Sequence, residues 1–189
     1  MRLRRRRPAG RRVSISTDAA FAAAPGDAWR AIVFYEEIEH RPPWLLRLAL
    51  PRPLRSEGAK DAAGGIVRCT YESGYLLKRM TAVEEGRLLA FDVVEQHLDF
   101  GGGVELLGGG VSIDPLGSDR ARVTLTTRYK RPWRPLDPVW AAIEERLVHG
   151  FHRHVLEGMR RSLARRGVRR GTPSEARPRS TVPSSRPTY

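Results

Sequence analysis

The hydrophobic positions of the chain follow two periods, and the longest helical one lies near the C-terminus. From residue 137 to 163, apolar side chains recur every three or four residues, which is typical of one buried face of a helix. Asp137 is a suitable N-cap, and Pro138 occupies the first helical position, where its missing N–H costs nothing. The pattern predicts a helix over 137–163 whose buried face contains Leu136, Trp140, Ile143, Leu147, Phe151 and His154.

Between residues 54 and 130 the period becomes two, and turn signals recur after about ten residues each. Glycine-containing turns at 64–65, 73–74 and 85–86, and a turn at 115–119, separate the alternating segments. Connections this short join antiparallel neighbours. The sequence therefore predicts an antiparallel meander with strands in 66–72, 75–85, 87–98, 101–113 and 120–130.

The first part of the chain adds a strand and two helices to this meander. Residues 13–24 alternate loosely and are expected to form the first strand, and Pro25-Gly26-Asp27 then turns into a helix over 28–40. Two prolines at 42–43 end that helix, and 44–50 is expected to form a second short helix.

The net charge of +13 belongs to the ends of the chain. Residues 1–12 contain seven arginines and no acid, and 160–189 contain nine arginines and Glu175. The remaining 18 basic and 20 acidic residues give 18 − 20 = −2 for residues 13–159. We therefore expect a folded domain over 13–163, a disordered arginine-rich leader over 1–12 and a disordered basic tail over 164–189.

Cysteine content and hydropathy bear on the compartment. Cys69 is the only cysteine, so no intrachain disulfide can form. No apolar run approaches the roughly 18 residues that span a bilayer. The basic N-terminus lacks the apolar segment of a signal peptide. The prediction is a cytoplasmic protein.

Several rows of core-facing residues contain polar side chains. In 120–130, Val123, Leu125, Thr127 and Tyr129 share a face, and in 87–97 the row of Leu89, Phe91 and Val93 continues into Glu95 and His97. Tyr71 ends a similar row that contains Val67 and Cys69. Either these residues lie beyond the covered core, or they orient a ligand in a largely apolar cavity between the sheet and the long helix.

Four stretches carry a resemblance to a known family: 22–32 (AAAPGDAWRAI), 64–74 (GGIVRCTYESG), 87–96 (RLLAFDVVEQ) and the helix from Asp137. Over 13–163 the chain resembles the START/SRPBCC superfamily, whose members include carriers, hormone receptors and polyketide cyclases. The resemblance implies an α+β helix-grip fold. In it, a curved antiparallel sheet wraps around a long C-terminal helix, with two short helices between strands 1 and 2 and a hydrophobic pocket inside.

The first functional hypothesis is non-enzymatic binding of an apolar or amphipathic small molecule, such as a lipid or polyketide-like compound. The residues expected to contact it are Tyr71, Phe91, Glu95, His97, Tyr129, Phe151 and His154. The alternative is an aromatase/cyclase or dehydratase that uses Glu95, His97 or His154 as acid or base. A third hypothesis is an interaction protein whose arginine tails contact anionic surfaces, without specific binding of nucleic acid.

No cofactor is predicted, and no metal site. Glu145, His149 and His152 are spaced so that they could share a helix face, but this is the charged face and no further acid or cysteine supports a metal. His149 and His152 are therefore expected to be exposed, and His154 is expected to face the interior.

Overall fold

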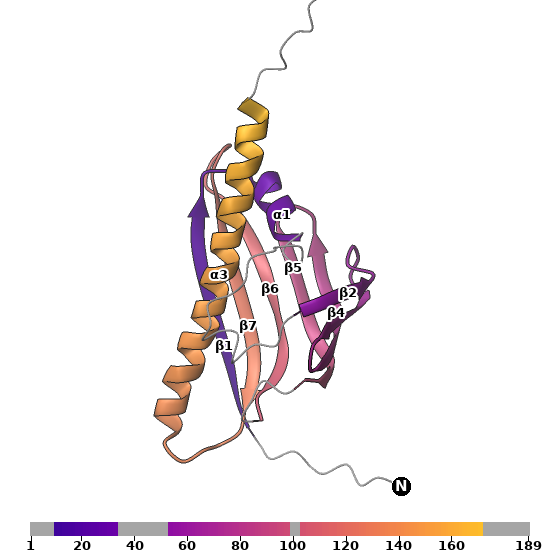
Figure 1. Ribbon diagram of the computed structural model, residues 1–189, viewed down its shortest axis with the longest axis vertical. Coiled ribbons are helices and arrows are strands. Elements are labelled where there is room, and N and C mark those ends of the chain that lie inside the picture. The colour runs from indigo at the N-terminus through magenta and orange to yellow at the C-terminus, as the bar shows by residue number, and fades with distance from the viewer. Residues whose placement is uncertain (1–9, 34–52, 99–102, 172–189) are drawn as a thin grey trace, which may run out of the picture.

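A computed structural model describes residues 10–33, 53–98 and 103–171 (Figure 1). In chain order it contains β1 (Arg11–Phe21), α1 (Pro25–Val33), β2 (Pro53–Gly58), β3 (Ile66–Tyr71), β4 (Gly74–Glu84), β5 (Leu88–His97), β6 (Glu105–Pro115), β7 (Ala121–Arg131) and α3 (Asp137–Gly171). The predicted second short helix, 44–50, lies outside the described residues.

All seven strands form one antiparallel sheet in the order β1-β7-β6-β5-β4-β3-β2. Consecutive strands from β2 to β7 are neighbours, because short turns connect them. The first strand pairs with the last along its whole length, from Arg11 opposite Arg131 to Phe21 opposite Ala121. The predicted meander is therefore confirmed, and β1 closes it at the edge that is not occupied by β2.

Both described helices lie on one side of the curved sheet, which we call the inner face; the opposite side is the outer face. In Figure 1, α3 runs lengthwise over β1 and β7, and α1 packs beside its C-terminal half. Together they bury a core that we call the helix-covered core. It consists of Phe21, Ala28, Trp29, Ala31, Ile32, Ile113, Ala121, Val123, Leu125, Val155, Leu156 and Met159.

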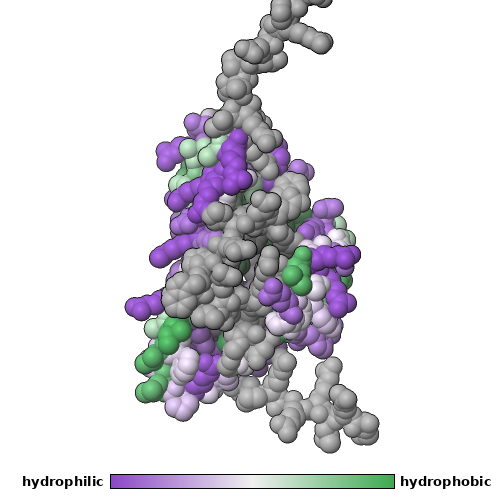
Figure 2. Space-filling model, in the orientation of Figure 1, coloured by the Kyte–Doolittle hydropathy of each residue, from purple (hydrophilic) through white to green (hydrophobic). Residues whose placement is uncertain are grey.

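The predicted buried face of α3 is wrong over its first turns. Leu136, Trp140 and Ile143 are 74%, 42% and 43% exposed. Figure 2 shows hydrophobic side chains at the surface near the lower end of the molecule, where α3 begins. The α3 residues with less than a tenth of their surface exposed begin at His152 and continue through Val155, Leu156, Gly158 and Met159.

A buried ion pair ties the start of α3 to the end of β7. The guanidinium of Arg131, only 3% exposed, donates from Nη1 and Nη2 to the two carboxylate oxygens of Asp137 at 2.8 and 2.9 Å. The turn between them places Leu136 at a φ of 58°, an unusual value for a residue with a side chain. The predicted helix start at Asp137 is confirmed, and its carboxylate forms an ion pair with Arg131.

The described elements extend beyond the predicted domain at both ends. β1 begins at Arg11 and α3 ends at Gly171, so residues 11–12 and 164–171 belong to regular structure instead of the predicted disordered ends. Arginine is a good helix former, which favours continuation of the helix through this arginine-rich segment. The rest of the predicted leader and tail lies outside the described residues, apart from Gly10.

Candidate functional site

A second hydrophobic cluster occupies the inner face of β3, β4 and β5. Val67, Cys69 and Met80 are buried in it, and Tyr71, Val83, Leu89 and Phe91 pack against them. We call this group the sheet cluster. Among the described residues it includes none from α1 or α3, in contrast to the helix-covered core. Two of the predicted ligand contacts, Tyr71 and Phe91, therefore lie together here, and both are half-buried.

One positive charge belongs to this apolar region. On β4, Leu76 and Met80 are buried on the inner face, and Lys78 lies between them on the same side. Its ammonium nitrogen lies 4.8 Å from the centre of the Phe91 ring. A lysine over a half-buried aromatic ring can bind a carboxylate, phosphate or carbonyl oxygen of a ligand that packs against the ring. Apolar residues occur at both odd and even positions of 75–84, so alternation alone did not show that Lys78 faces inward.

Glu95 and His97 lie on the outer face, so the prediction that they face the core with Phe91 is wrong. Lys78 pairs with Val93, but Leu77 pairs with Glu95, which leaves Val94 as an extra residue in a β-bulge. One extra residue reverses the alternation of everything that follows it. The inner-facing row of β5 therefore ends near Val93, and 44% and 56% of the Glu95 and His97 side chains are exposed.

On the outer face these two residues belong to a surface network. Glu95 accepts hydrogen bonds from the Tyr75 hydroxyl at 2.9 Å and from His97 Nε2 at 2.6 Å. The bond from Tyr75, and then that from His97, lowers the pKa of Glu95. The imidazole of His97 stacks on the Tyr75 ring, with centres 4.6 Å apart, and Arg68 covers the same ring. This arrangement stabilises the charged form of Glu95 at the surface. Neither Glu95 nor His97 is placed to act as an acid on the inner face.

The buried histidine of α3 is His152, so the assignment of His154 to the interior and of His152 to the charged face is wrong. His152 is 1% exposed, whereas His154 is half-buried and has no hydrogen-bond partner among the described residues. Both ring nitrogens of His152 are satisfied: Nδ1 lies 2.8 Å from the Thr17 hydroxyl and Nε2 lies 2.8 Å from the Thr127 hydroxyl.

A chain of hydrogen bonds leads from this histidine to the surface. The Thr17 hydroxyl also lies 2.7 Å from Nδ1 of His149, whose side chain is 31% exposed and lies 3.8 Å from Glu145. Burial, and secondarily the nearby His149, lowers the pKa of His152 from 6.5 to about 4. His152 is therefore neutral near pH 7, with one ring nitrogen donating and the other accepting.

A third polar group surrounds Tyr129, at the end of the inner face where α3 begins. Tyr129 is buried, and Glu144 of α3 lies beside it. Burial, reinforced by the Glu144 charge, raises the pKa of Tyr129 to about 12, and burial also raises that of Glu144. Glu144 Oε2 lies 3.7 Å from Arg131 Nε, and both atoms are buried without a hydrogen bond. Tyr129 is therefore protonated at neutral pH and lies next to the carboxylate that faces Arg131.

The predicted contacts therefore separate into three groups. Tyr71 and Phe91 lie in the sheet cluster, and Glu95 and His97 lie on the outer face. Phe151 is half-buried and packs against the helix-covered core, with its ring centre 6.2 Å from that of His152. Thr17, Lys78, Glu144 and His152 are the inner-face polar residues that the sequence did not identify.

In 10–33, 53–98 and 103–171, no group of three histidine, cysteine or acidic side chains is arranged to hold a metal ion. None of the helices in these ranges combines the length and the apolar character that crossing a bilayer requires.

The sequence matches no family model and no curated protein. The fold, in contrast, is similar to solved structures. Norcoclaurine synthase from Thalictrum flavum is 16% identical with a TM-score of 0.55, over 85% of this chain and 99% of that one. The ZhuI aromatase/cyclase from Streptomyces sp. R1128 is 15% identical with a TM-score of 0.54, over 85% and 99%. Ara h 8.0201 is 11% identical with a TM-score of 0.51, over 82% and 99%.

These similarities and the sheet-and-helix arrangement define the class. The chain has the helix-grip fold of START/SRPBCC-type proteins, and the predicted fold class is confirmed. At such identities the likeness concerns the fold, which hosts both ligand-binding proteins and enzymes.

Proposed function

We propose that this protein binds an apolar or amphipathic small molecule, of lipid-like or polyketide-like chemistry, against the inner face of β3, β4 and β5. The observation that supports it is the sheet cluster, where half-buried Tyr71 and Phe91 pack, Lys78 lies over the Phe91 ring, and none of the members among the described residues belongs to α1 or α3. Mostly apolar surface with one well-placed polar group is typical of small-molecule sites.

Lys78 suggests the polarity of the ligand. An ammonium group beside the apolar residues of the sheet cluster favours a ligand with an acidic or carbonyl oxygen at one position and rings or an alkyl chain elsewhere. A protein of similar fold binds molecules of this kind: norcoclaurine synthase was solved in complex with dopamine and hydroxybenzaldehyde. That likeness supports a small aromatic ligand here without identifying it.

Two probes test the site. We expect native mass spectrometry of the purified protein, followed by organic extraction, to detect a bound small molecule. After extraction, the neutral probe N-phenyl-1-naphthylamine and the anionic probe 1-anilinonaphthalene-8-sulfonate should both bind saturably. Lys78→Met should weaken binding of the anionic probe about tenfold, the effect of losing roughly 1.4 kcal/mol of a charge-assisted contact, and leave the neutral probe unaffected.

Arg79→Met is the matched control, because it removes the same charge from the next residue of β4, which is exposed on the outer face. It should change neither affinity. The proposal is refuted if the extracted protein binds neither probe saturably. It is also refuted if Lys78→Met and Arg79→Met weaken binding of the anionic probe equally.

The enzymatic alternative has less support than binding. Glu95 and His97 belong to the outer-face network, which leaves His154 as the remaining sequence-predicted acid or base. An aromatase/cyclase or dehydratase would lose turnover in His154→Ala while keeping its melting temperature. The hypothesis of tail-mediated contacts rests largely on residues outside those described, and it stays a prediction, as does a cytoplasmic location.

A further inference from the structure

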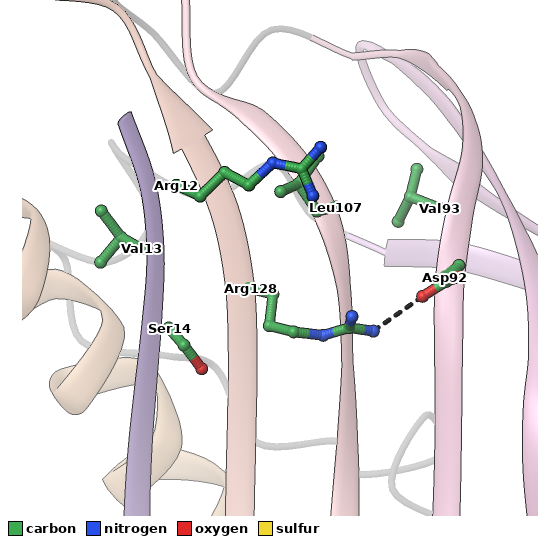
Figure 3. A pocket seen from close by; sticks show the side chains of 7 residues that line it. All are labelled: Arg12, Val13, Ser14, Asp92, Val93, Leu107 and Arg128. Carbon is green, nitrogen blue, oxygen red and sulfur yellow. Dashed lines mark hydrogen bonds and ion pairs between the residues drawn. The ribbon is translucent and has the colours of Figure 1, made fainter. Parts of the chain in front are cut away.

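A pocket of about 380 Å³ opens on the outer face, away from both described helices (Figure 3). It lies where β5 and β6 separate, since their backbone pairing ends at Asp92 opposite Gly108. Beyond that point β6 continues to pair with β7, as far as Glu105 opposite Lys130. The space between the diverging strands is large enough for a small molecule.

Arg128 forms one side of this pocket and is held in place by β5. Its side chain crosses β6 over Gly108, where a Cβ atom would lie 2.7 Å from Nη2. Nη2 then donates to the backbone oxygen of Phe91 at 3.1 Å and to the carboxylate of Asp92 at 2.7 Å. The other N–H groups of this guanidinium have no partner among the described residues. They are available to an anion without breaking the contacts that fix the side chain.

Arg12 supplies a second guanidinium to the same space. Arg12 and Ser14 of β1 are paired with Lys130 and Arg128 of β7, which places all four on the outer face. In Figure 3 the side chains of Arg12 and Arg128 extend in the same direction, toward β6 and β5. Arg12 has no ion pair within the described part of the chain, so the pocket contains two guanidinium groups and one carboxylate, that of Asp92.

We propose that this outer pocket binds the carboxylate or phosphate group of a small amphipathic molecule. The anion lies between Arg12 and Arg128, with the Ser14 hydroxyl as a further donor, and guanidinium groups suit both anions because they donate in parallel pairs. Val93 and Leu107, which also line the pocket, contact the apolar part of the molecule. This site is separate from the sheet cluster, because no residue of that cluster lines the pocket and both guanidinium groups lie on the outer face.

Titration calorimetry of the full chain at low salt tests the proposal with four probes: phenyl phosphate, benzoate, inorganic phosphate and benzyl alcohol. Phenyl phosphate or benzoate should bind saturably and more tightly than inorganic phosphate, because only the organic anions contact Val93 and Leu107. Benzyl alcohol, which has no charge, should not bind. The comparison of the first two probes distinguishes a phosphate site from a carboxylate site.

Arg12→Gln should weaken binding of the organic anion about tenfold, since one charge-assisted contact is lost. Arg122→Gln is the matched control: Arg122 is also on the outer face of β7, 53% exposed, and 3.9 Å from Asp18. Arg122→Gln should leave the affinity for the organic anion unchanged. Equal weakening by both variants would indicate unspecific attraction to a basic protein and would overturn the proposal, as would the absence of saturable binding by either organic anion. The affinity of the inner face for N-phenyl-1-naphthylamine should be unchanged in Arg12→Gln.

Discussion

The buried imidazole of His152 predicts a specific loss of stability in mild acid. Folding lowers its pKa from 6.5 to about 4, so between these values the unfolded chain binds a proton that the folded protein does not. The stabilisation from neutral His152 is complete above pH 6.5 or so and is lost progressively as the pH falls, levelling off below about pH 4.

The magnitude follows from the two pKa values. At pH 7.5 almost no His152 is protonated in either state. At pH 5.0 the unfolded imidazole is almost fully protonated and the folded one only slightly, which corresponds to a loss of about 2 kcal/mol in the free energy of unfolding between these pH values. Against a total stability on the order of 5–15 kcal/mol, urea titrations will detect this change.

The assay compares urea unfolding of the unchanged protein and of His152→Gln at pH 7.5 and pH 5.0. Glutamine retains a donor and an acceptor for Thr17 and Thr127 but does not titrate. The variant starts from a lower stability, and its loss between the two pH values should be about 2 kcal/mol smaller than that of the unchanged protein.

His97→Gln provides the control, because His97 is a histidine with 56% of its side chain exposed on the outer face. It should keep most of the original pH dependence. If His152→Gln and the unchanged protein lose the same stability between pH 7.5 and 5.0, protonation of His152 does not cause the loss and the reasoning is refuted.

Other predictions concern a buried charge and two glycines. Arg131→Met removes the cation paired with Asp137 and one of the two cations near Glu144, the other being Arg134, and urea unfolding should show a loss of about 3–5 kcal/mol. A loss below about 1 kcal/mol would contradict this account of the α3 anchor. Gly26→Ala, in α1 with nothing within 4 Å of the added Cβ, should raise the melting temperature by up to a few degrees, since alanine is the better helix former. Gly109→Ala should lower it, because the added Cβ would lie 2.6 Å from the Thr126 oxygen and 3.2 Å from the Phe91 ring; a rise would refute that contact.

The sequence was informative where structure depends on neighbours along the chain. The alternation of Val123, Leu125, Thr127 and Tyr129 predicted their shared inner face, and the Asp137-Pro138 pair predicted where α3 begins. These features depend on backbone period and capping, which act within a few residues.

The errors arose where the outcome depends on distant parts of the chain. The bulge at Val94 cannot be identified from alternation, because the extra residue is defined by its pairing with β4. The buried side of α3 depends on where the helix crosses the sheet. Apolar residues are therefore exposed in its first turns, and His152 is buried against Thr17, a partner far away in the sequence.

The glycine run of β6 connects the two proposed sites. A bulge lies in this run, between Leu106 and Gly108. The glycines also remove side chains from both faces of one strand: Gly109 leaves space on the inner face for the Phe91 ring, and Gly108 leaves space on the outer face for Arg128. Phe91 and Arg128 themselves meet, since the Arg128 guanidinium bonds to the Phe91 backbone oxygen. Displacement of β5 by a ligand on one face would therefore reach the other through this hydrogen bond, because β6 has no side chain at Gly108 or Gly109, where the contacts cross it.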